Sequence, residues 1–583
     1  METEYSYKRL FSFFKQFLGP YWVRFFTATF FSAVSSALSL FNAYAVATVV
    51  TLVIAHKAGE SLTRLYFILI AWFLAIIINF SSRFISRIIG MPMAEMAAKD
   101  AEIFSIKHLS LLDISWHEKE NSGSKLKKID RGAQNIIDVT RLWLGPIVDI
   151  TISVIGAFII ISRFDVPLLG LLTVYLVIYF YIARFTRTRA VAAVKQVNIK
   201  DEEITGFFYE IVANIRTIKV LGMAQKILEY AQIGIQDYAS RVKKRVFWFQ
   251  GAALLRGVWE GSVRVLLFVF IIWNIFRGRY EVGFLILFYG YFNTLTNSIG
   301  NLSDVAQELA TYKVNVGRVT DILDENITID NEEGKKDFPQ TWEHILIKDL
   351  TFNYGDNKVL SNMDLEIKKG EKIGIVGLSG AGKSTLFKLL LKEYENYDGS
   401  IVIGGIPLKE IKKTSYIRHM AAVLQETEVF NMSLRQNITL ANSSEENNQQ
   451  LFERALDIAH VNDFLPKLSH GVETVIGEKG VKLSGGERQR LGIARAVFKT
   501  PEILFLDEAT SHLDIESEQK IQDSLKKFFK DVTAVVIAHR LSTIREMDRI
   551  IVIEGGVVIE TGTFDELYAK DGRFRTFWDK QKI

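Results

Sequence analysis

The chain has 583 residues, of which 49% are hydrophobic and 23% are charged, and its formal net charge is +4. At roughly 100–200 residues per domain this length predicts more than one domain, and the composition excludes a disordered chain, which would need low hydrophobicity and high charge. The absence of cysteine excludes disulfides, thiolate metal sites and cysteine nucleophiles, and the small net charge gives no indication of nucleic-acid binding.

The first half of the chain contains six stretches that are long enough to cross a bilayer, since a spanning helix needs about 20 mostly apolar residues. These stretches lie near residues 22–54, 65–84, 142–162, 166–183, 247–275 and 284–305. Small or polar side chains interrupt three of them, and interhelical packing is the simplest interpretation of Ser35, Ser36, Asn42, Thr151, Asn293 and Asn297. The sequence therefore predicts an all-α transmembrane domain of six helices over residues 1–320.

The connections between these stretches indicate how the domain is oriented. Two of them, residues 85–141 and 184–246, are long and rich in lysine and arginine, and the positive-inside tendency assigns them to the cytoplasm. Both contain few helix-breaking residues, so we expect each span to continue as a helix beyond the bilayer. This topology predicts an integral, multi-pass protein of a bacterial-type inner or plasma membrane, with both termini in the cytoplasm.

The segment that precedes the first span, Tyr5–Leu18, is aromatic and basic, which suits a helix lying at the inner membrane interface. It lacks the small-residue cleavage site of a signal peptide, so we do not predict one. Because the chain begins shortly before the first span, we also expect no N-terminal peptidase domain.

The second half of the chain has a different character. Residues 321–341 are acidic and polar and predict a linker, and no apolar run over residues 342–583 is long enough to span a membrane. The strand predicted at Lys372–Val376 leads directly into the sequence Gly-Leu-Ser-Gly-Ala-Gly-Lys-Ser-Thr, which fits the P-loop pattern G-x-x-x-x-G-K-[ST]. Glycines let the backbone wrap around phosphate, and the following helix adds the positive end of its dipole. We therefore predict ATP contacts from Gly377, Ser379, Gly380, Gly382, Lys383, Ser384 and Thr385, with Lys383 at the β and γ phosphates and Ser384 at Mg²⁺.

Two further motifs carry chemistry that complements a P-loop. An apolar strand ends in Asp507 and Glu508, where the first carboxylate can hold Mg²⁺ and the second can activate water as a general base. Alone, two carboxylates after a strand more often start a helix, but the P-loop in the same domain favours the catalytic interpretation. Ser484 is a natural helix N-cap beside Gly485 and Gly486, so this helix start predicts a second anion site.

Together these motifs resemble the nucleotide-binding domain of an ATP-binding cassette (ABC) transporter, whose signature stands here as Leu-Ser-Gly-Gly-Glu-Arg-Gln-Arg at residues 483–490. The resemblance implies that Tyr354 stacks on adenine and that Gln425 contacts Mg²⁺ and the attacking water. It also implies that Asp514 belongs to the D-loop and that His539 contacts the γ-phosphate. Alone, Tyr354 would be a half-buried strand tyrosine and His539 a strand-end histidine, but their order among the motifs favours the family roles.

The first half of the chain resembles the membrane domain of the exporter branch of this family, in which six spans precede one cassette in a half-transporter. Asp113–Gly123 and Glu203–Lys219 are similar to the two coupling segments of that branch. The resemblance implies an all-α membrane domain followed by an α/β P-loop ATPase domain with an antiparallel β subdomain and a helical subdomain. It also implies a pair of cassettes that face head to tail, with ATP held between the P-loop of one and the signature of the other.

The implied activity is ATP-driven export or lipid flipping by alternating access, with ATP and Mg²⁺ as cofactors. Because Lys383, Asp507, Glu508, Ser484 and His539 are all intact, both ATP sites of a homodimer would be competent, and we favour a homodimer over a heterodimer. Lipids, lipid-linked sugars, peptides and amphipathic drugs all stay open as cargo. The alternatives are a membrane-tethered ABC-type ATPase and a channel or regulator on the same fold, and ATP-dependent accumulation in vesicles would separate a pump from either.

The fifth span carries three ionisable residues, Arg256, Glu260 and Arg264, at a spacing of four, so they share one helical face. An ionisable group near the bilayer centre costs at least about 2.5–3.5 kcal/mol on insertion scales, which disfavours a lipid-facing position. Three interpretations stay open. In the first, Glu260 neutralises both arginines in an i,i+4 ladder that packs against another helix. In the second, the Arg256 side chain extends to the membrane surface and takes no part in the group. In the third, the face lines the translocation cavity and attracts an anionic or polar part of the cargo.

Overall fold

The computed structural model describes residues 5–57, 60–118, 122–164, 166–425, 427–477, 481–507, 528, 532–537 and 544–581. Contacts within the chain divide it into two compact units. The helical unit comprises Met1–Ser105 and Lys127–Ile322, and the α/β unit comprises Ile106–Leu126 and Leu323–Ile583. The tip of the first long loop therefore groups with the C-terminal half of the chain.

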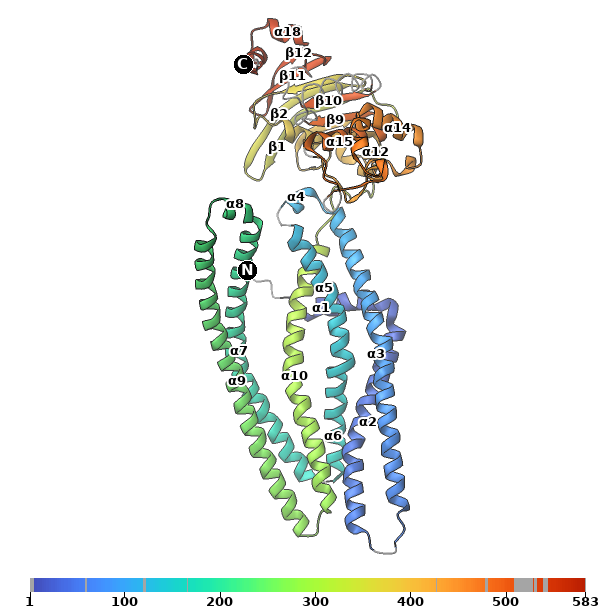
Figure 1. Ribbon diagram of the computed structural model, residues 1–583, viewed down its shortest axis with the longest axis vertical. Coiled ribbons are helices and arrows are strands. Elements are labelled where there is room, and N and C mark those ends of the chain that lie inside the picture. The colour runs from blue at the N-terminus through green and yellow to red at the C-terminus, as the bar shows by residue number, and fades with distance from the viewer. Residues whose placement is uncertain are drawn as a thin grey trace. The chain divides into compact units, whose positions relative to one another are not determined.

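Long helices make up most of the first half of the chain (Figure 1). They are α1 (Tyr7–Leu18), α2 (Trp22–Ala55), α3 (Thr63–Leu111), α4 (Ile114–His117), α5 (Ser122–Leu142), α6 (Val148–Phe164), α7 (Val166–Ala213), α8 (Ile215–Val220), α9 (Ala224–Phe276) and α10 (Val282–Leu323). At 1.5 Å per residue the 53-residue α9 is about 80 Å long, against about 30 Å of hydrocarbon. The predicted helical continuation of both long loops is confirmed, and α7 and α9 lie side by side with α8 joining their ends (Figure 1).

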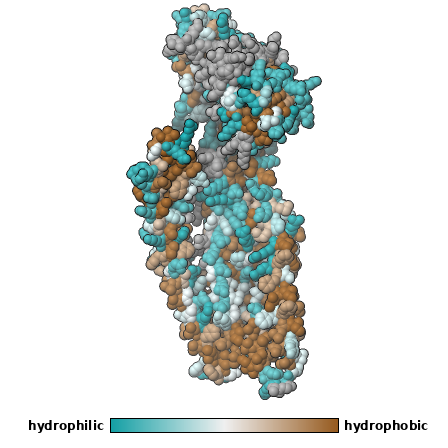
Figure 2. All heavy atoms as spheres, in the orientation of Figure 1, coloured by the Kyte–Doolittle hydropathy of each residue, from teal (hydrophilic) through white to brown (hydrophobic). Residues whose placement is uncertain are grey.

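Five helical stretches in the described part of the chain are long and apolar enough to cross a membrane, and Figure 2 shows apolar residues covering the lower part of the bundle in its view. They are Tyr7–Ala55, Thr63–Leu111, Lys125–Arg163, Pro167–Ala213 and Ala224–Phe276, which contain the first five predicted spans. The sixth predicted span, 284–305, lies within α10, where Asn293 and Asn297 dilute the apolar run. The count of six spans therefore stays a prediction.

Small polar residues of α2 make hydrogen bonds to neighbouring helices. The hydroxyl of Ser36 donates to the carboxylate of Asp149 on α6. The hydroxyl of Ser35 donates to the side-chain oxygen of Asn79 on α3 at 3.3 Å. These contacts agree with interhelical packing as the role of the two serines, since a polar group inside a bilayer needs a partner within the protein.

Four of the long helical stretches contain proline, which inside a helix removes a backbone hydrogen bond and loosens the helix around it. Pro20 and Pro167 stand at the start of a helix, where the missing N–H costs little. Pro92 lies inside α3, and Pro146 lies in a π-helical turn, Trp143–Ile147, that joins α5 to α6. Neither α9 nor α10 contains proline. The backbone hydrogen-bond ladder of these two helices is therefore not interrupted by proline.

The N-terminal helix α1 is amphipathic, as predicted for this segment. Its buried face consists of Leu10, Phe13, Phe14, Phe17 and Leu18. Arg9 and Tyr5 donate to the carboxylate of Asp321 near the end of α10, at 2.8 and 2.6 Å. The helix is thus attached to the unit by both apolar and polar contacts, and its position at a membrane interface stays a prediction.

The described residues of the α/β unit form three sheets. The largest has the strand order β12-β11-β3-β10-β9-β6, with β3 (Lys372–Val376), β6 (Met420–Val423), β9 (Ile503–Asp507), β10 (Thr533–Ile537), β11 (Arg549–Glu554) and β12 (Val557–Gly562). All neighbours in this sheet are parallel except β12. An antiparallel sheet has the order β2-β1-β4-β5, with β1 (His344–Tyr354), β2 (Asn357–Lys368), β4 (Asp398–Ile403) and β5 (Ile406–Pro407). A short pair joins β7 (Met432–Ser433) to β8 (Val475–Ile476).

Apolar residues bury both faces of the parallel sheet. On β11, Ile551 and Ile553 join the core shared with the antiparallel sheet, whereas Ile550 and Val552 join a second core beneath the helices. The helices of the unit after the linker are α11 (Lys383–Leu390), α12 (Lys413–His419), α13 (Leu434–Thr439), α14 (Gln449–Ile458), α15 (Gly485–Phe498), α18 (Phe564–Ala569) and α19 (Arg573–Gln581). The predicted fold class is confirmed: an all-α domain precedes an α/β domain with an antiparallel β part and a helical part.

The predicted linker, residues 321–341, is docked along much of its length. The backbone N–H of Lys336 donates to the carbonyl of Glu410, and the N–H of Lys412 donates back to the carbonyl of Lys336, both at 2.7 Å. Phe338 is buried in the core near the antiparallel sheet. The domain boundaries at 320 and 342 stay predictions, but this segment is part of the α/β unit from Leu323 onward.

Candidate ATP site and intramembrane face

The P-loop joins β3 to α11 through glycines that no other residue would replace without strain. Gly380 and Gly382 have φ angles of +81° and +102°, which residues with a Cβ rarely adopt. At Gly377 a Cβ would lie 2.3 Å from the carbonyl oxygen of Ile553 on β11. The backbone can therefore make the tight turn that a phosphate cradle requires.

Lys383 is the first residue of α11, and its side chain folds back over the loop. Its Nζ atom donates to the carbonyl oxygens of Gly377 and Leu378 at 2.8 and 2.9 Å, and the residue is only 6% exposed. Ser379 and Ser384 are exposed beside it, whereas Thr385 is buried. The ammonium group thus lies within the loop that is predicted to hold phosphates.

The parallel strands bring Gly377, Gln425 and Asp507 to one edge of the sheet. Gly377 follows the last residue of β3, Asp507 is the last residue of β9, and Gln425 stands just after β6. In register, Ile537 of β10 pairs with Asp507 on one side and with Ile375 on the other, so the strand ends are nearly level. Ligands of open parallel sheets bind outside the carboxyl ends of the strands, and this edge is the predicted ATP site.

Three predicted site residues, Glu508, Asp514 and His539, lie outside the described residues. Their roles stay predictions from the sequence.

The oxygen donors at this edge fit Mg²⁺. The candidates are the hydroxyl of Ser384, the side-chain amide of Gln425 and the carboxylate of Asp507. Mg²⁺ prefers such hard oxygen ligands and usually takes only one or two carboxylates, with water and substrate phosphates completing its shell. Among the described residues, no group of three or more histidine, aspartate or glutamate side chains could hold a metal by itself, so phosphates would have to supply part of the shell.

Tyr354, the predicted adenine-stacking residue, ends β1 inside an aromatic group. Its ring centroid lies 4.8 Å from that of Phe352 and 5.6 Å from that of Tyr394. The Nζ atom of Lys388 lies 5.8 Å from the centre of the Tyr354 ring and 5.7 Å from that of Tyr394. Because Lys388 belongs to α11, the helix that follows the P-loop also contacts the aromatic group around Tyr354.

This aromatic group also contacts the predicted first coupling segment, within the α/β unit. The hydroxyl of Tyr394 donates to Glu118 at 2.7 Å, and Nζ of Lys388 lies 3.6 Å from the same carboxylate. Burial and the hydrogen bond to Glu118 raise the pKa of Tyr394. No predicted motif contains Tyr394, and Lys388 was marked only by its place in the P-loop helix. Glu118 lies within the predicted first coupling segment, Asp113–Gly123, but no pattern in the sequence assigned it a role of its own.

The predicted signature segment starts α15 as its sequence indicates. Ser484 is the N-cap: its hydroxyl accepts from the N–H of Glu487 at 3.3 Å, while the carboxylate of Glu487 accepts from the N–H of Ser484 at 2.8 Å. Leu483 is buried and anchors the segment, whereas Ser484 is exposed. Gly485 and Gly486 open a 14-residue helix, so this exposed start presents the positive end of a helix dipole.

In the helical unit, the three ionisable residues of α9 do not form a continuous ladder. Arg264 Nη2 lies 2.5 Å from Glu260 Oε1, and its guanidinium carbon lies 5.6 Å from the centre of the Phe292 ring. Arg256 Nε instead donates to the carbonyl of Ala252 on its own helix at 3.3 Å. Of the two ion pairs in the predicted ladder, the structure therefore contains the one between Glu260 and Arg264.

Two family models match this chain. The model described as "ABC transporter transmembrane region" matches residues 25–299, and the model described as "ABC transporter" matches residues 360–511. A putative multidrug export ATP-binding/permease protein of Staphylococcus aureus is 30% identical over 531 residues, which cover 88% of this chain and 89% of that relative. The chain belongs to the ABC transporter family. It is an exporter-type half-transporter, a multi-pass membrane protein whose ATPase is coupled to transport.

Other members of the family are similar over most of this chain. The alpha-hemolysin translocation ATP-binding protein HlyB of Escherichia coli O157:H7 is 30% identical, with 89% of this chain and 72% of the relative covered. Heavy metal tolerance factor 1 of Caenorhabditis elegans is also 30% identical over 84% of this chain, which spans 61% of that longer relative. The solved structure of a bacterial Atm1-family ABC exporter with ATP bound matches with a TM-score of 0.85 over 97% of this chain and 99% of that chain, at 23% identity, and so shares its fold.

Proposed function

We propose that this ABC exporter works as a dimer that moves an amphipathic, lipid-linked or peptide cargo from the cytoplasmic side outward by alternating access. The observation that carries the proposal is the meeting of Gly377, Gln425 and Asp507 at one edge of the sheet. The exposed helix start at Ser484 supplies a separate anion-binding surface on the same chain. Two copies of one chain would therefore supply both halves of two complete ATP sites, which supports a homodimer over a heterodimer.

Each residue of the site then has a distinct task in binding. The P-loop backbone and Lys383 hold the β and γ phosphates, and Tyr354 stacks on adenine. Ser384, Gln425 and Asp507 would hold Mg²⁺, which would offset the negative charge of the phosphates. The contacts of Lys383 with two loop carbonyls support this assignment, because they hold its ammonium group inside the cradle.

Hydrolysis requires residues from both copies. Glu508 accepts the proton of the attacking water, and His539 contacts the γ-phosphate as it leaves. The second copy contributes its helix start and its D-loop, through Ser484, Gly485, Gly486 and Asp514. Binding of ATP closes the pair, and hydrolysis allows it to reopen, so nucleotide biases a two-state membrane domain.

We assign the polar face of α9 to contact with the cargo. Tyr175 Oη and Arg264 Nε are both buried without a hydrogen-bond partner among the described residues, and both side chains lie against the Phe292 ring. Two such donors favour a cargo group that accepts hydrogen bonds. Since Glu260 pairs with Arg264, Arg256 is the arginine that we assign to the negative charge of an anionic cargo.

The basic long loops support a topology in which both termini and the ATPase domain are cytoplasmic, in a bacterial-type inner or plasma membrane. The test is transport by the purified chain in proteoliposomes, with lipid, peptide and drug probes. We expect ATP-dependent accumulation of one cargo class and stimulation of the ATPase by that class, both absent in Lys383→Ala. Hydrolysis that is never accompanied by accumulation would instead favour a tethered ATPase or a regulator.

A further inference from the structure

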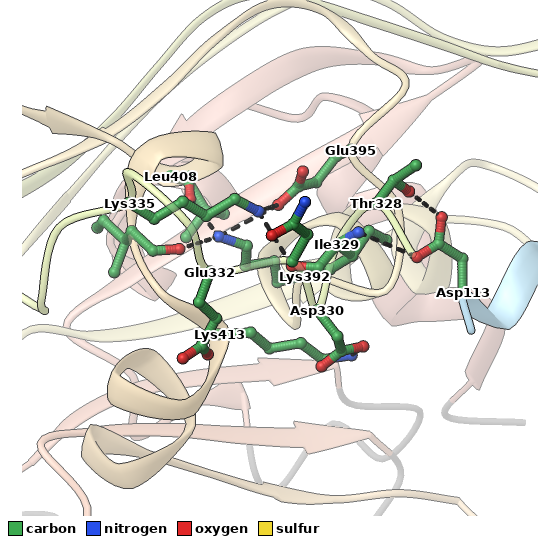
Figure 3. Close-up of polar contacts among 12 residues, drawn as sticks. Asp113, Thr328, Ile329, Asp330, Glu332, Lys335, Lys392, Glu395, Leu408 and Lys413 are labelled. Atoms are coloured by element: carbon green, nitrogen blue, oxygen red, sulfur yellow. Dashed lines mark hydrogen bonds and ion pairs between the residues drawn. The ribbon is translucent and has the colours of Figure 1, made fainter. Parts of the chain in front are cut away.

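The predicted first coupling segment begins with an aspartate that does not cap its helix. Asp113 stands at the N-cap of α4 with extended φ and ψ of −64° and 148°, and its side chain makes no capping hydrogen bond. The carboxylate instead accepts the backbone N–H of Ile329 at 3.0 Å and the hydroxyl of Thr328 (Figure 3). Aspartate is among the strongest N-cap residues, so its use on another segment marks a contact that the α4 sequence alone does not explain.

The other side of this contact is held firmly by the α/β unit. The carbonyl of Ile329 accepts from Nζ of Lys335 at 3.0 Å, and Lys335 lies 3.5 Å from Glu395 (Figure 3). The next linker residue, Asp330, forms an ion pair with Lys413 at 2.8 Å. Both Asp330 and Lys413 have side chains less than a fifth exposed, so solvent screens this pair less than it screens a surface pair.

Glu395 connects the linker to a buried lysine just beyond the P-loop helix. Lys392 is 0% exposed, and its Nζ atom lies 3.1 Å from Glu395 and donates to the carbonyls of Leu408, at 2.7 Å, and Ile411. Burial lowers the pKa of Lys392, and Glu395 opposes this shift. Since α11 ends at Leu390, these contacts place the linker strap, Thr328–Lys335, against the segment that follows the P-loop helix.

The four-residue helix α4 is therefore fixed at both ends. Asp113 attaches its N-terminal end to the linker strap, and Glu118 attaches its C-terminal end to Tyr394. A helix this short has little stability of its own, and a single attachment would let it pivot. We propose that Asp113 is a positioning residue that fixes the orientation of the coupling segment through the linker strap, so that hydrolysis is converted into transport. This role rests on the proposed export function.

The test compares two substitutions at one position in the full chain. Asp113→Asn keeps an acceptor oxygen of the same reach, whereas Asp113→Ser is a good N-cap for α4 but is too short to reach Ile329. Losing hydrogen bonds to a charged acceptor shifts the attached state by about tenfold or more. In proteoliposomes we therefore expect Asp113→Ser to lower the transport-to-ATPase ratio about tenfold with little change in ATPase activity or in KM for ATP, and Asp113→Asn to stay within about threefold of the parent ratio.

Hydrogen exchange supplies a readout that does not depend on cargo. We expect a peptide containing the Ile329 amide to exchange about tenfold faster in Asp113→Ser than in Asp113→Asn, because only the serine variant frees that N–H. Equal exchange and equal coupling in the two variants would overturn the proposal, since Asp113 would then serve only to start α4. Should the parent transport no cargo, the export function fails, and the exchange comparison still decides whether Asp113 holds the strap.

Thr328→Val guards against a folding defect at Asp113, because it changes only the linker side of the contact. It should lower the transport-to-ATPase ratio in the same direction and should add little further loss to Asp113→Ser. A ratio unchanged in Thr328→Val would contradict the strap as the route, and so would a full additional loss in the double variant.

Discussion

Replacing Arg264 with alanine would leave the carboxylate of Glu260 without its partner inside the helical bundle. The two side chains are 2.5 Å apart at their charged atoms, and they are 30% and 28% exposed. The guanidinium also lies over the rings of Tyr289 and Phe292, at 5.9 and 5.6 Å. The substitution therefore removes one ion pair and two cation–π contacts, and it leaves the negative charge of Glu260 without a partner.

The expected cost follows from these contacts. Breaking one partner of a fully buried pair costs about 3–5 kcal/mol, because the remaining charge is left without compensation. The partial exposure of both side chains lets solvent reduce this cost, while the ring contacts add about 0.5–1 kcal/mol each. We therefore expect Arg264→Ala to lower the free energy of unfolding by about 2–4 kcal/mol.

The double variant Glu260→Gln/Arg264→Gln decides whether charge is the cause. It removes both charges at once, and replacing an ion pair by neutral groups is often close to neutral for stability. Thermal unfolding of the purified chain and its two single glutamine variants completes a double-mutant cycle, for which we expect a coupling energy of about 1–3 kcal/mol. Single variants within about 0.5 kcal/mol of the parent, with no recovery in the double variant, would refute the reasoning.

Transport measurements on the same variants show whether Glu260 and Arg264 only pack within the bundle or also contact the cargo. If the double variant recovers stability and still transports, the Glu260–Arg264 pair is structural. Arg256 is the matched arginine, about two helical turns from Arg264. We expect Arg256→Ala to leave stability and basal ATPase nearly unchanged but to lower cargo stimulation. If cargo still stimulates the ATPase of both variants, this face is not part of the cargo site.

Three further substitutions test the ATP site and its support. Glu508→Gln should still bind ATP but lose about 10²–10⁴-fold in turnover and trap a closed dimer, and hydrolysis within about threefold of the parent would contradict the general-base role. Lys383→Ala should stop transport and hydrolysis. Unchanged ATPase activity of this variant at saturating Mg-ATP would disprove the role of Lys383 at the phosphates. Lys392→Met strands the carbonyls of Leu408 and Ile411. It should lower the stability of the α/β unit by about 2–4 kcal/mol in thermal unfolding, and no measurable shift would argue against the buried ammonium as a structural support.

The P-loop could be predicted from the sequence because its chemistry is local. A backbone that turns tightly with positive φ needs glycine, so the spacing of Gly377, Gly380 and Gly382 already specifies the shape that the structure contains. The strands that lead into the P-loop and into Asp507 could be predicted for a similar reason, because each is a short apolar run that ends where a parallel strand delivers functional residues to the edge of the sheet. Local requirements of this kind leave a direct trace in the order of residues.

The linker strap could not be predicted in this way. An acidic and polar stretch is expected to be solvated, yet Asp330 pairs with Lys413, which is 83 residues further along the chain. Asp113 meets Ile329 across 216 residues. Such pairs depend on how the folded chain brings distant segments together, and they leave no periodic signal. The same reason hid Tyr394, whose hydroxyl finds Glu118 only after both segments have folded.

The unbroken length of α9 has a mechanical consequence. If a helix about 80 Å long rotates by about 5° about one end, its other end moves by about 7 Å. This displacement is roughly the combined width of two neighbouring side chains. No proline breaks the hydrogen-bond ladder of α9, whereas the π-helical turn at Pro146 interrupts the regular helix between α5 and α6. A displacement of a few ångströms at one end of α9 therefore corresponds to a rotation of only a few degrees about its other end.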